Sequence, residues 1–330
     1  MRGGGLNRLY HSYDDIISLE NLLEAWKEFL RGKRNKKDVQ EFQLHLMDNV
    51  ISLHNDLKDK TYSHGPYHAF NISDPKPRNI HKASVRDRLL HHAVYRVLYP
   101  YFDKKFISDS YSCRLNKGTH RAINQFRKYY RKVSKNNTKQ CWVLKCDIKK
   151  FFISIDHSIL LQILEKHIKD QDTILLLKRI ITSFETFPGK GLPLGNLTSQ
   201  LLVNIYMNEF DHFVKRELKV KYYIRYADDF VVFASGREYL IRFLHLFQDF
   251  LVRDLKLSLH PYKVFIKTLS SGIDFLGWVH FPDHRVLRTV TKRRMVRNLA
   301  KNPSREIKAS YLGLLKHGNT YKLQSKINPT

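Results

Sequence analysis

Three aspartates in two apolar segments are the residues of this chain best suited to phosphate chemistry. Asp228 and Asp229 lie within residues 222–233, where aromatic and β-branched residues flank the acidic pair. This pattern predicts a hairpin whose tight turn carries two carboxylates. Neighbouring carboxylates repel each other, so the pair either lies in open solvent, as turn aspartates often do, or holds a cation.

A third carboxylate ends the second apolar segment. Residues 142–148 read Trp-Val-Leu-Lys-Cys-Asp-Ile, which predicts a strand that ends at Asp147. One carboxylate at a strand end and two on a hairpin turn can converge on a pair of Mg²⁺ ions, the arrangement that in-line phosphoryl transfer needs at its attacking and leaving oxygens. Mn²⁺ would satisfy the same oxygen ligands.

The elements that must position these residues are both helices and strands. Helical spacing of apolar residues runs through 18–32, 37–57, 84–99 and 240–251, and residues 67–72 alternate as a strand. Pro100 is expected to stop the third of these helices, and Ser199 is expected to cap the helix that precedes the acidic hairpin. Two further helices, at 291–300 and 305–315, are rich in Lys and Arg. The sequence therefore predicts an α/β chain with a basic helical end.

The charge balance indicates a polyanionic partner. The chain has 58 Lys and Arg against 31 Asp and Glu, a formal net charge of +27. The basic residues are interleaved with aromatic and apolar ones, which is typical of a folded nucleic-acid-binding surface and not of a disordered basic tail. Nucleic acid is the natural candidate.

The remaining composition bounds the compartment. Cys113, Cys141 and Cys146 have no paired metal spacing and are too few for a disulfide framework, so we expect small core residues and a reducing cytoplasm. Residues 1–7 lack the apolar stretch of a signal peptide, and no run reaches the length of a membrane span. We therefore expect no membrane partner.

Three segments together resemble the successive palm motifs of a reverse transcriptase, in the family's order. They are residues 147–152 (Asp-Ile-Lys-Lys-Phe-Phe), 192–200 (Leu-Pro-Leu-Gly-Asn-Leu-Thr-Ser-Gln) and 226–229 (Tyr-Ala-Asp-Asp). The resemblance extends from about Leu19 to Tyr321. It implies a right-hand polymerase with the following parts: an N-terminal helical extension (1–60), fingers (61–140), a palm with part of the fingers interleaved (141–284) and a short helical thumb (285–330).

The resemblance also implies roles for individual residues. Asp147, Asp228 and Asp229 would be catalytic, and the metal ions would lie at Asp147, Ile148, Asp228 and Asp229. Nucleotide contacts are expected from Lys76, Arg78, Phe152, Leu194, Gly195, Gln200 and Lys263. Primer or template contacts are expected from Arg114, Lys117, Tyr226, Gly277 and Trp278.

Several of these roles have a plainer alternative. Phe152 stands where the family places a bulky ring that blocks a ribose 2′-hydroxyl, which predicts DNA synthesis, but Phe151 and Phe152 could both be core residues. Lys76 and Arg78 resemble a Lys and Arg over the incoming nucleotide in group II intron-like enzymes, or they belong to a surface loop. Lys263 aligns with a lysine near the leaving pyrophosphate, or it is a solvated lysine.

The second motif departs from the common pattern. Retroviral and group II enzymes carry Gln at the position of Leu194 and Pro at that of Gln200, whereas this chain is similar to the reverse transcriptases of diversity-generating retroelements. That resemblance implies a bacterial or phage-encoded cytoplasmic enzyme that copies a template repeat RNA into cDNA from dNTPs, with errors at adenines. Its partners would be template RNA, the cDNA primer and product, and a small basic accessory variability protein that forms a ring. The alternatives are an antiphage, retron-like or group II-derived reverse transcriptase, or an inactive RNA-binding scaffold.

Overall fold

The acidic segments belong to one antiparallel sheet at the centre of the chain. The computed structural model describes residues 12–73 and 77–327. Its central sheet has the strand order β4-β5-β3-β6. The strands are β3 (Trp142–Asp147), β4 (Tyr223–Tyr226), β5 (Asp229–Ala234) and β6 (Phe265–Thr268). As predicted, β4 and β5 form an antiparallel hairpin around the acidic pair, and β3 ends at Asp147.

Strand alternation divides the apolar residues of this sheet between two cores. Leu144 and Phe230 pack on one face, in the large core shared with α9 (Leu197–His212) and α10 (Arg237–Leu255). Val143 and Val231 point the other way, toward α6 (Thr119–Val133), whose apolar face includes the buried ring of Phe126. The sheet is therefore buried on both sides, and its polar strand residues need specific partners.

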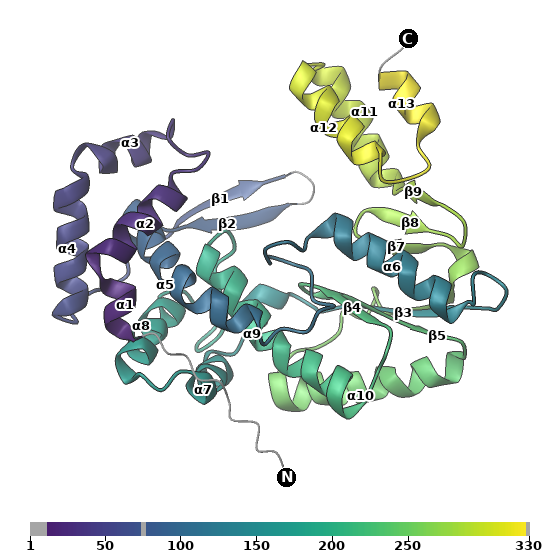
Figure 1. Cartoon of the computed structure of the whole chain (residues 1–330), viewed down its shortest axis with the longest axis horizontal. Coiled ribbons are helices and arrows are strands. Elements are labelled where there is room, and N and C mark those ends of the chain that lie inside the picture. Colours follow the sequence, from purple (N-terminus) through teal and green to yellow (C-terminus); the bar gives the residue numbers. More distant parts are fainter. Residues whose placement is uncertain (1–11, 74–76, 328–330) are drawn as a thin grey trace.

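A layer of helices covers the N-terminal side of the molecule (Figure 1). Its helices are α1 (Tyr13–Ile17), α2 (Leu19–Phe29), α3 (Lys37–Leu44), α4 (Leu46–Lys58), α5 (Val85–Asp103), α7 (His157–His167) and α8 (Gln171–Thr182). The single helix expected over 37–57 is broken at His45, which has φ −119° and ψ 41°. The stop expected at Pro100 is wrong: α5 continues to Asp103, and burial of Leu98 and Phe102 offsets the lost backbone hydrogen bond.

A two-stranded hairpin projects from this layer toward the C-terminal helices (Figure 1). It is formed by β1 (His68–Ile72) and β2 (Arg78–Lys82), paired in antiparallel register from His68 with Lys82 to Ile72 with Arg78. Its side chains are mostly exposed. The hairpin is thus free to face a large ligand.

The C-terminal part combines a small sheet with basic helices. The strands β7 (Ile273–Phe275), β8 (Trp278–His280) and β9 (Arg285–Leu287) pair in that order. The helices are α11 (Thr289–Lys301), α12 (Arg305–Leu315) and α13 (Tyr321–Ile327). Trp278, Met295 and Leu315 form a separate core that joins them to Ile123 of α6. Short helical segments complete the chain: η1 (Phe151–Ser154), η2 (Phe213–Glu217) and η3 (Leu269–Ser271).

Two composition-based expectations concern the described residues directly. Within them, no helix has the length and apolar character that crossing a membrane would require. All three cysteines are free, and Cys141 and Cys146 are buried as expected. Cys113 is exposed, because it lies in a loop with φ +52°, so its assignment to the core is wrong.

Candidate active site

The β4–β5 hairpin carries Asp228 in its turn and Asp229 at the first position of β5, so the prediction that the turn holds both carboxylates is right only for Asp228. Tyr226 ends β4 and Asp229 begins β5, so only Ala227 and Asp228 form the turn. Ala227 has φ +55°, the left-handed region that a residue with a Cβ seldom adopts. The turn is tight, and its shape fixes the direction of the Asp228 carboxylate.

Strand register brings Asp147 next to this turn. Asp147 of β3 is the direct partner of Asp229 of β5, and both side chains therefore project from the same face. Lys263 forms an ion pair with Asp147, with 3.0 Å between Nζ and Oδ1. The lysine predicted to lie near the site thus contacts one of its carboxylates in the structure.

The carboxyl group of Asp228 is strongly perturbed. Burial and the neighbouring carboxylates of Asp147 and Asp229 raise the pKa of Asp228 from 3.8 to about 6. Its backbone carbonyl accepts a hydrogen bond from the backbone amide of Ile148, at 3.2 Å. The turn is therefore tied to the residue after Asp147, and the two carboxylates repel each other at neutral pH.

Asp229 is paired with a lysine that the sequence analysis did not single out. The Nζ of Lys145 lies 2.8 Å from Oδ1 of Asp229, and the Lys145 side chain is only 8% exposed. Burial raises the pKa of Asp229, and the charge of Lys145 opposes that shift. A lysine in the middle of the apolar run Trp-Val-Leu-Lys-Cys was the available signal, because a buried lysine needs an anionic partner.

The donor set suits Mg²⁺ completed by a substrate. Among the described residues, no group of three or more His, Cys, Asp or Glu side chains is arranged to hold an ion. Asp147 and Asp228 supply two carboxylates, and the buried Ile148 has only its carbonyl oxygen to offer. Mg²⁺ is usually held by one or two carboxylates together with substrate phosphates, so two carboxylates that repel each other fit that ion.

Phe152 lies beside the site, on the short helix η1. Phe151 is 4% exposed and belongs to the core, whereas Phe152 is half-buried. The Phe152 carbonyl accepts a hydrogen bond from the amide of Leu192, at 2.8 Å. This bond joins η1 to the bend that contains Leu194.

The bend at Leu194 and Gly195 is attached to strand β2. The amide of His81 donates to the Leu194 carbonyl at 3.0 Å, and the Asn196 side-chain amide donates to the His81 carbonyl at 2.8 Å. Gly195 has φ +105°, and a Cβ there would lie 2.7 Å from a methyl group of Ile80. Glycine is therefore required by both conformation and contact.

The helix after this bend begins earlier than expected. Asn196, and not Ser199, is the N-cap residue of α9, because Ser199 is already buried inside the first turn. Leu194 is half-buried in the bend, and Gln200, also half-buried, lies on α9 itself. The motif is thus divided between a bend and a helix.

The predicted phosphate contacts of the fingers are described only in part. Arg78 is exposed at the start of β2, and its side chain makes no hydrogen bond or ion pair with the residues that the structure describes. Its guanidinium is available to a ligand. Lys76 lies outside the described residues.

The predicted template contacts differ in their exposure. Arg114 is turned inward: its side chain is 5% exposed and donates to Asp103 (2.7 Å) and to the carbonyl of Ile107 (2.7 Å). A direct template contact is therefore not expected from Arg114, which fixes the shape of its loop. Lys117 is more open and donates to a backbone carbonyl at 2.7 Å, and Tyr226 accepts a bond from Thr119 at 3.1 Å.

The glycine and tryptophan of the small sheet also separate. Gly277 has φ +86° in the turn between β7 and β8, and its carbonyl accepts from the amide of Arg288. Trp278 is 1% exposed, and a Cβ on Gly318 would lie 2.0 Å from its ring. Contact between the Trp278 side chain and a primer is therefore not expected, because this ring is a core residue.

Comparisons with known proteins agree with this geometry. The sequence model of the family described as reverse transcriptase (RNA-dependent DNA polymerase) matches residues 72–280. Protein YkfC of Escherichia coli (strain K12) is 26% identical over 284 residues, covering 74% of this chain and 72% of YkfC. The group II intron-encoded protein LtrA of Lactococcus lactis is 24% identical over 318 residues, covering 72% of this chain and 50% of LtrA. This chain therefore spans about half the length of LtrA.

A solved structure supports the fold. The structure of apo telomerase from Candida tropicalis, truncated from its C-terminal domain, is similar with a TM-score of 0.50 and 11% sequence identity. The similarity covers 74% of this chain and 60% of the telomerase chain. At this identity it concerns the fold alone, which is the right-hand arrangement of fingers, palm and thumb.

Proposed function

The chain belongs to the reverse transcriptase family and is an RNA-directed DNA polymerase, and we propose that it copies a template repeat RNA into cDNA for a diversity-generating retroelement. The observation that carries the catalytic part is the approach of Asp147 to the turn at Asp228, where burial and the neighbouring carboxylates raise the pKa of Asp228 to about 6. Perturbed carboxyl groups of this kind are typical of functional sites. The template RNA, the primer and dNTPs are the expected ligands.

We propose that the site catalyses in-line phosphoryl transfer, in which the primer 3′-hydroxyl attacks the α-phosphate of a dNTP and pyrophosphate leaves. Asp147, Asp228 and the carbonyl of Ile148 are suited to hold two Mg²⁺ ions, and that pair, when bound, supplies Lewis-acid stabilisation of the reacting oxygens. Asp229 orients the strand through its pair with Lys145. We propose that Lys263, which contacts Asp147, stabilises or protonates the leaving group.

The residues around this centre would select the nucleotide. We propose that the half-buried ring of Phe152 excludes a ribose 2′-hydroxyl and that Lys76 and Arg78 bind the triphosphate. Leu194, Gly195 and Gln200 would line the nucleotide and template base. The division into extension (1–60), fingers (61–140), palm (141–284) and thumb (285–330) is part of the same proposal.

The retroelement type is proposed from one motif. An aliphatic Leu194 followed by Ser199 and Gln200 is the pattern of the diversity-generating class. Leu194 cannot make the hydrogen bonds of a glutamine, so polar discrimination at the base would weaken. In that class a small basic accessory variability protein would be the partner, and errors would fall at template adenines.

A second candidate is supported by the relatives. YkfC and the group II intron-encoded protein LtrA both match most of this chain, which favours a group II-derived enzyme of ordinary fidelity. The two candidates share the catalytic site and differ in the pattern of errors.

One experiment tests the activity and separates the candidates. The purified protein is given a primed RNA template with dNTPs and Mg²⁺, and the cDNA is sequenced, with Asp147→Asn as the control. Synthesis by the wild type alone, with errors concentrated opposite adenine, supports the proposal. Errors spread evenly over the four template bases favour the group II-derived candidate, and synthesis by Asp147→Asn would show that the site is misassigned.

A further inference from the structure

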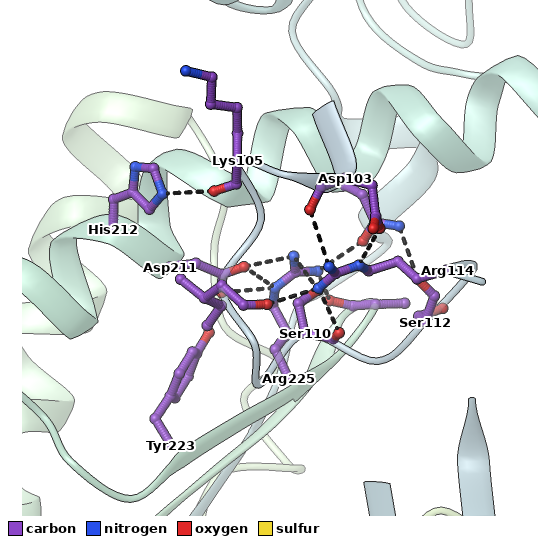
Figure 2. A network of polar contacts seen from close by, with 12 residues as sticks. Asp103, Lys105, Ser110, Ser112, Arg114, Asp211, His212, Tyr223 and Arg225 are labelled. Atoms are coloured by element: carbon purple, nitrogen blue, oxygen red, sulfur yellow. Dashed lines mark hydrogen bonds and ion pairs between the residues drawn. The ribbon is translucent and has the colours of Figure 1, made fainter. Parts of the chain in front are cut away.

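A buried network of charged side chains connects β4, in the hairpin that carries Asp228, with helix α9 (Figure 2). Strand β4 alternates, so Ile224 packs toward α6 while Tyr223 and Arg225 point toward α9. Arg225 and Asp211 of α9 are both 0% exposed. Their ion pair is closed by bonds of 2.8 and 3.0 Å from Nε and 2.7 Å from Nη2 to the carboxylate.

The rest of the guanidinium is also fully used. Its Nη2 donates to the hydroxyl of Ser110 at 3.1 Å, and its Nη1 donates to the side-chain oxygen of Asn204 at 3.3 Å. Tyr223 donates its hydroxyl hydrogen to Asp211 at 2.7 Å. With the bond described next, all five N–H donors of Arg225 have acceptors.

One bond of this network reaches the catalytic turn itself. The second donor of Nη1 bonds the carbonyl of Ala227, at 3.1 Å. Ala227 is the residue with φ +55° that precedes Asp228, and this left-handed conformation is unfavourable for a residue with a Cβ. The bond therefore acts where the turn is strained and where the direction of Asp228 is decided.

The backbone of Arg225 also bonds to the loop that precedes α6. Its amide donates to the carbonyl of Asp109 at 2.9 Å, and its own carbonyl accepts from Tyr111 at 3.0 Å. Arg225 thus joins α9, the loop before α6 and the catalytic turn. These three segments are far apart in the sequence.

The energetics favour a geometric role over a stabilising one. A buried ion pair loses hydration that its mutual attraction only partly restores, and replacing both partners by apolar residues is often neutral for stability. A planar fork that satisfies several acceptors fixes their relative positions more firmly than a point charge does. The network would therefore be retained for the position of the turn.

We propose that Arg225 and Asp211 are positioning residues that hold the Ala227–Asp228 turn in the conformation that presents the Asp228 carboxylate. They lie on the face of the sheet that packs against α9, and in this proposal they contact no substrate. The inference rests on the proposed role of Asp228 in synthesis. It assigns a purpose to a buried charge pair outside the catalytic motif.

The test uses Arg225→Lys, which keeps the positive charge but cannot span Asp211 and the Ala227 carbonyl at once. We expect hydrogen exchange of residues 226–229 in the metal-free protein to be at least about tenfold faster. The Mg²⁺ concentration for half-maximal synthesis should rise about 10–100-fold, the range found for residues that orient metal ligands, while KM for dNTP changes little. Unchanged exchange together with an unchanged Mg²⁺ requirement would overturn the proposal.

A second variant guards against misfolding. Arg225→Met combined with Asp211→Leu removes both charges, so no uncompensated ion remains in the core. We expect it to fold cooperatively and to show the same faster exchange and higher Mg²⁺ requirement. A folded double variant with wild-type values for both would also overturn the proposal.

Arg114→Met is the matched control. Arg114 is another buried arginine of the network and donates to the Ser110 carbonyl at 3.0 Å, but it has no bond to the turn (Figure 2). Its Mg²⁺ requirement should stay within about twofold of the wild type, well below the range expected for Arg225→Lys. Asp228→Asn completes the design: synthesis by this variant would sink the proposed site, whereas its inactivity with a null result for Arg225→Lys would sink only this inference.

Discussion

The charged groups on the two sides of the catalytic hairpin differ in how completely they are paired. Toward α9, Arg225 and Asp211 are fully buried, and every donor of the guanidinium has an acceptor. At the carboxylate end, Asp147 and Asp229 each have one lysine, and Asp228 is left with a raised pKa. A satisfied network fixes geometry, whereas an excess of carboxylates attracts a cation, which can in turn bind a triphosphate.

The largest expected effect comes from the unsatisfied side. Asp228→Asn or Asp147→Asn keeps the shape of the site but removes one charge, and the loss of several kcal/mol of transition-state stabilisation should lower cDNA synthesis by at least about 10³-fold. RNA binding should remain, because the basic residues are unchanged. Primer extension and fluorescence anisotropy on one RNA measure the two effects, and robust synthesis by either variant would refute the site.

A variant that breaks the paired Arg225–Asp211 network should lower the stability of the folded protein. Asp211→Ala leaves Arg225 buried without its counter-ion, and we expect a loss of about 3–5 kcal/mol in the free energy of unfolding. Asp228→Asn should not lose stability, because its carboxylate lacks such a partner. Urea denaturation of the metal-free variants compares them. Equal losses would mean that the two sides do not differ in charge compensation.

Phe151 and Phe152, the adjacent rings of η1, offer a similar contrast between a core side chain and a half-buried one. Phe151→Ala empties a core position and should cost about 3–5 kcal/mol of stability. Phe152→Ala should cost less and should instead admit ribonucleotides, with discrimination between dNTP and NTP falling about tenfold or more. Incorporation assays with each nucleotide decide the matter. If Phe152→Ala loses stability with unchanged sugar selectivity, Phe152 is a core residue and another side chain is the gate.

The sequence predicted the elements whose pattern is local. The hairpin around Asp228 and the strand ending at Asp147 follow from alternation and turn chemistry, and their order matches the family motifs. The partners of buried charges were not predictable in this way. Lys145 and Arg225 interrupt apolar strands, which signals a buried counter-ion, but Asp229 and Asp211 become those partners only through the sheet register and the packing of α9.

The errors have the same origin. Pro100 lies inside α5 because tertiary burial outweighs the local preference to end a helix. Arg114 and Trp278 were expected to contact nucleic acid because their segments resemble family motifs, yet both side chains are enclosed by other parts of the chain. Residue type and motif position alone do not determine which way a side chain faces.

The raised pKa of Asp228 predicts a pH-dependent stability difference. Between about pH 4 and pH 6 the folded protein keeps a proton on Asp228 that the unfolded chain, with a pKa of 3.8, has released. Stability contributed by this proton is present at low pH and is lost as the pH rises through 6. Metal-free Asp228→Asn should therefore be more stable than the wild type at pH 7 by about 3 kcal/mol, and nearly equal at pH 4.

Thermal melts at both pH values, with and without Mg²⁺, measure this effect. Added Mg²⁺ should stabilise the wild type and reverse the order of the two proteins, because the ion needs the ionised carboxylate. A pH-independent difference would show that the ionised Asp228 carboxylate does not destabilise the folded protein. Equal stabilisation of both proteins by Mg²⁺ would show that Asp228 is not a ligand of the ion.

The smallest expected effect concerns Leu194, whose side chain is half-buried in the bend before α9. If its aliphatic side chain leaves a base without a polar partner, wrong pairing is disfavoured by less than in an enzyme with glutamine. One hydrogen bond is worth about 1 kcal/mol, or several-fold in selectivity. Leu194→Gln should then lower misincorporation opposite template adenine several-fold, as measured by sequencing cDNA made on one RNA by both proteins.

Two comparisons isolate the polar group. Leu194→Met keeps an apolar side chain of similar volume and should leave the adenine error rate unchanged, and the other three template bases serve as internal references. The bond from the His81 amide to the Leu194 carbonyl involves the backbone alone, so we expect both variants to keep the position of the bend. Equal adenine error rates in the wild type and Leu194→Gln would mean that Leu194 only packs beneath the nucleotide, and the link between this motif and diversification would fail.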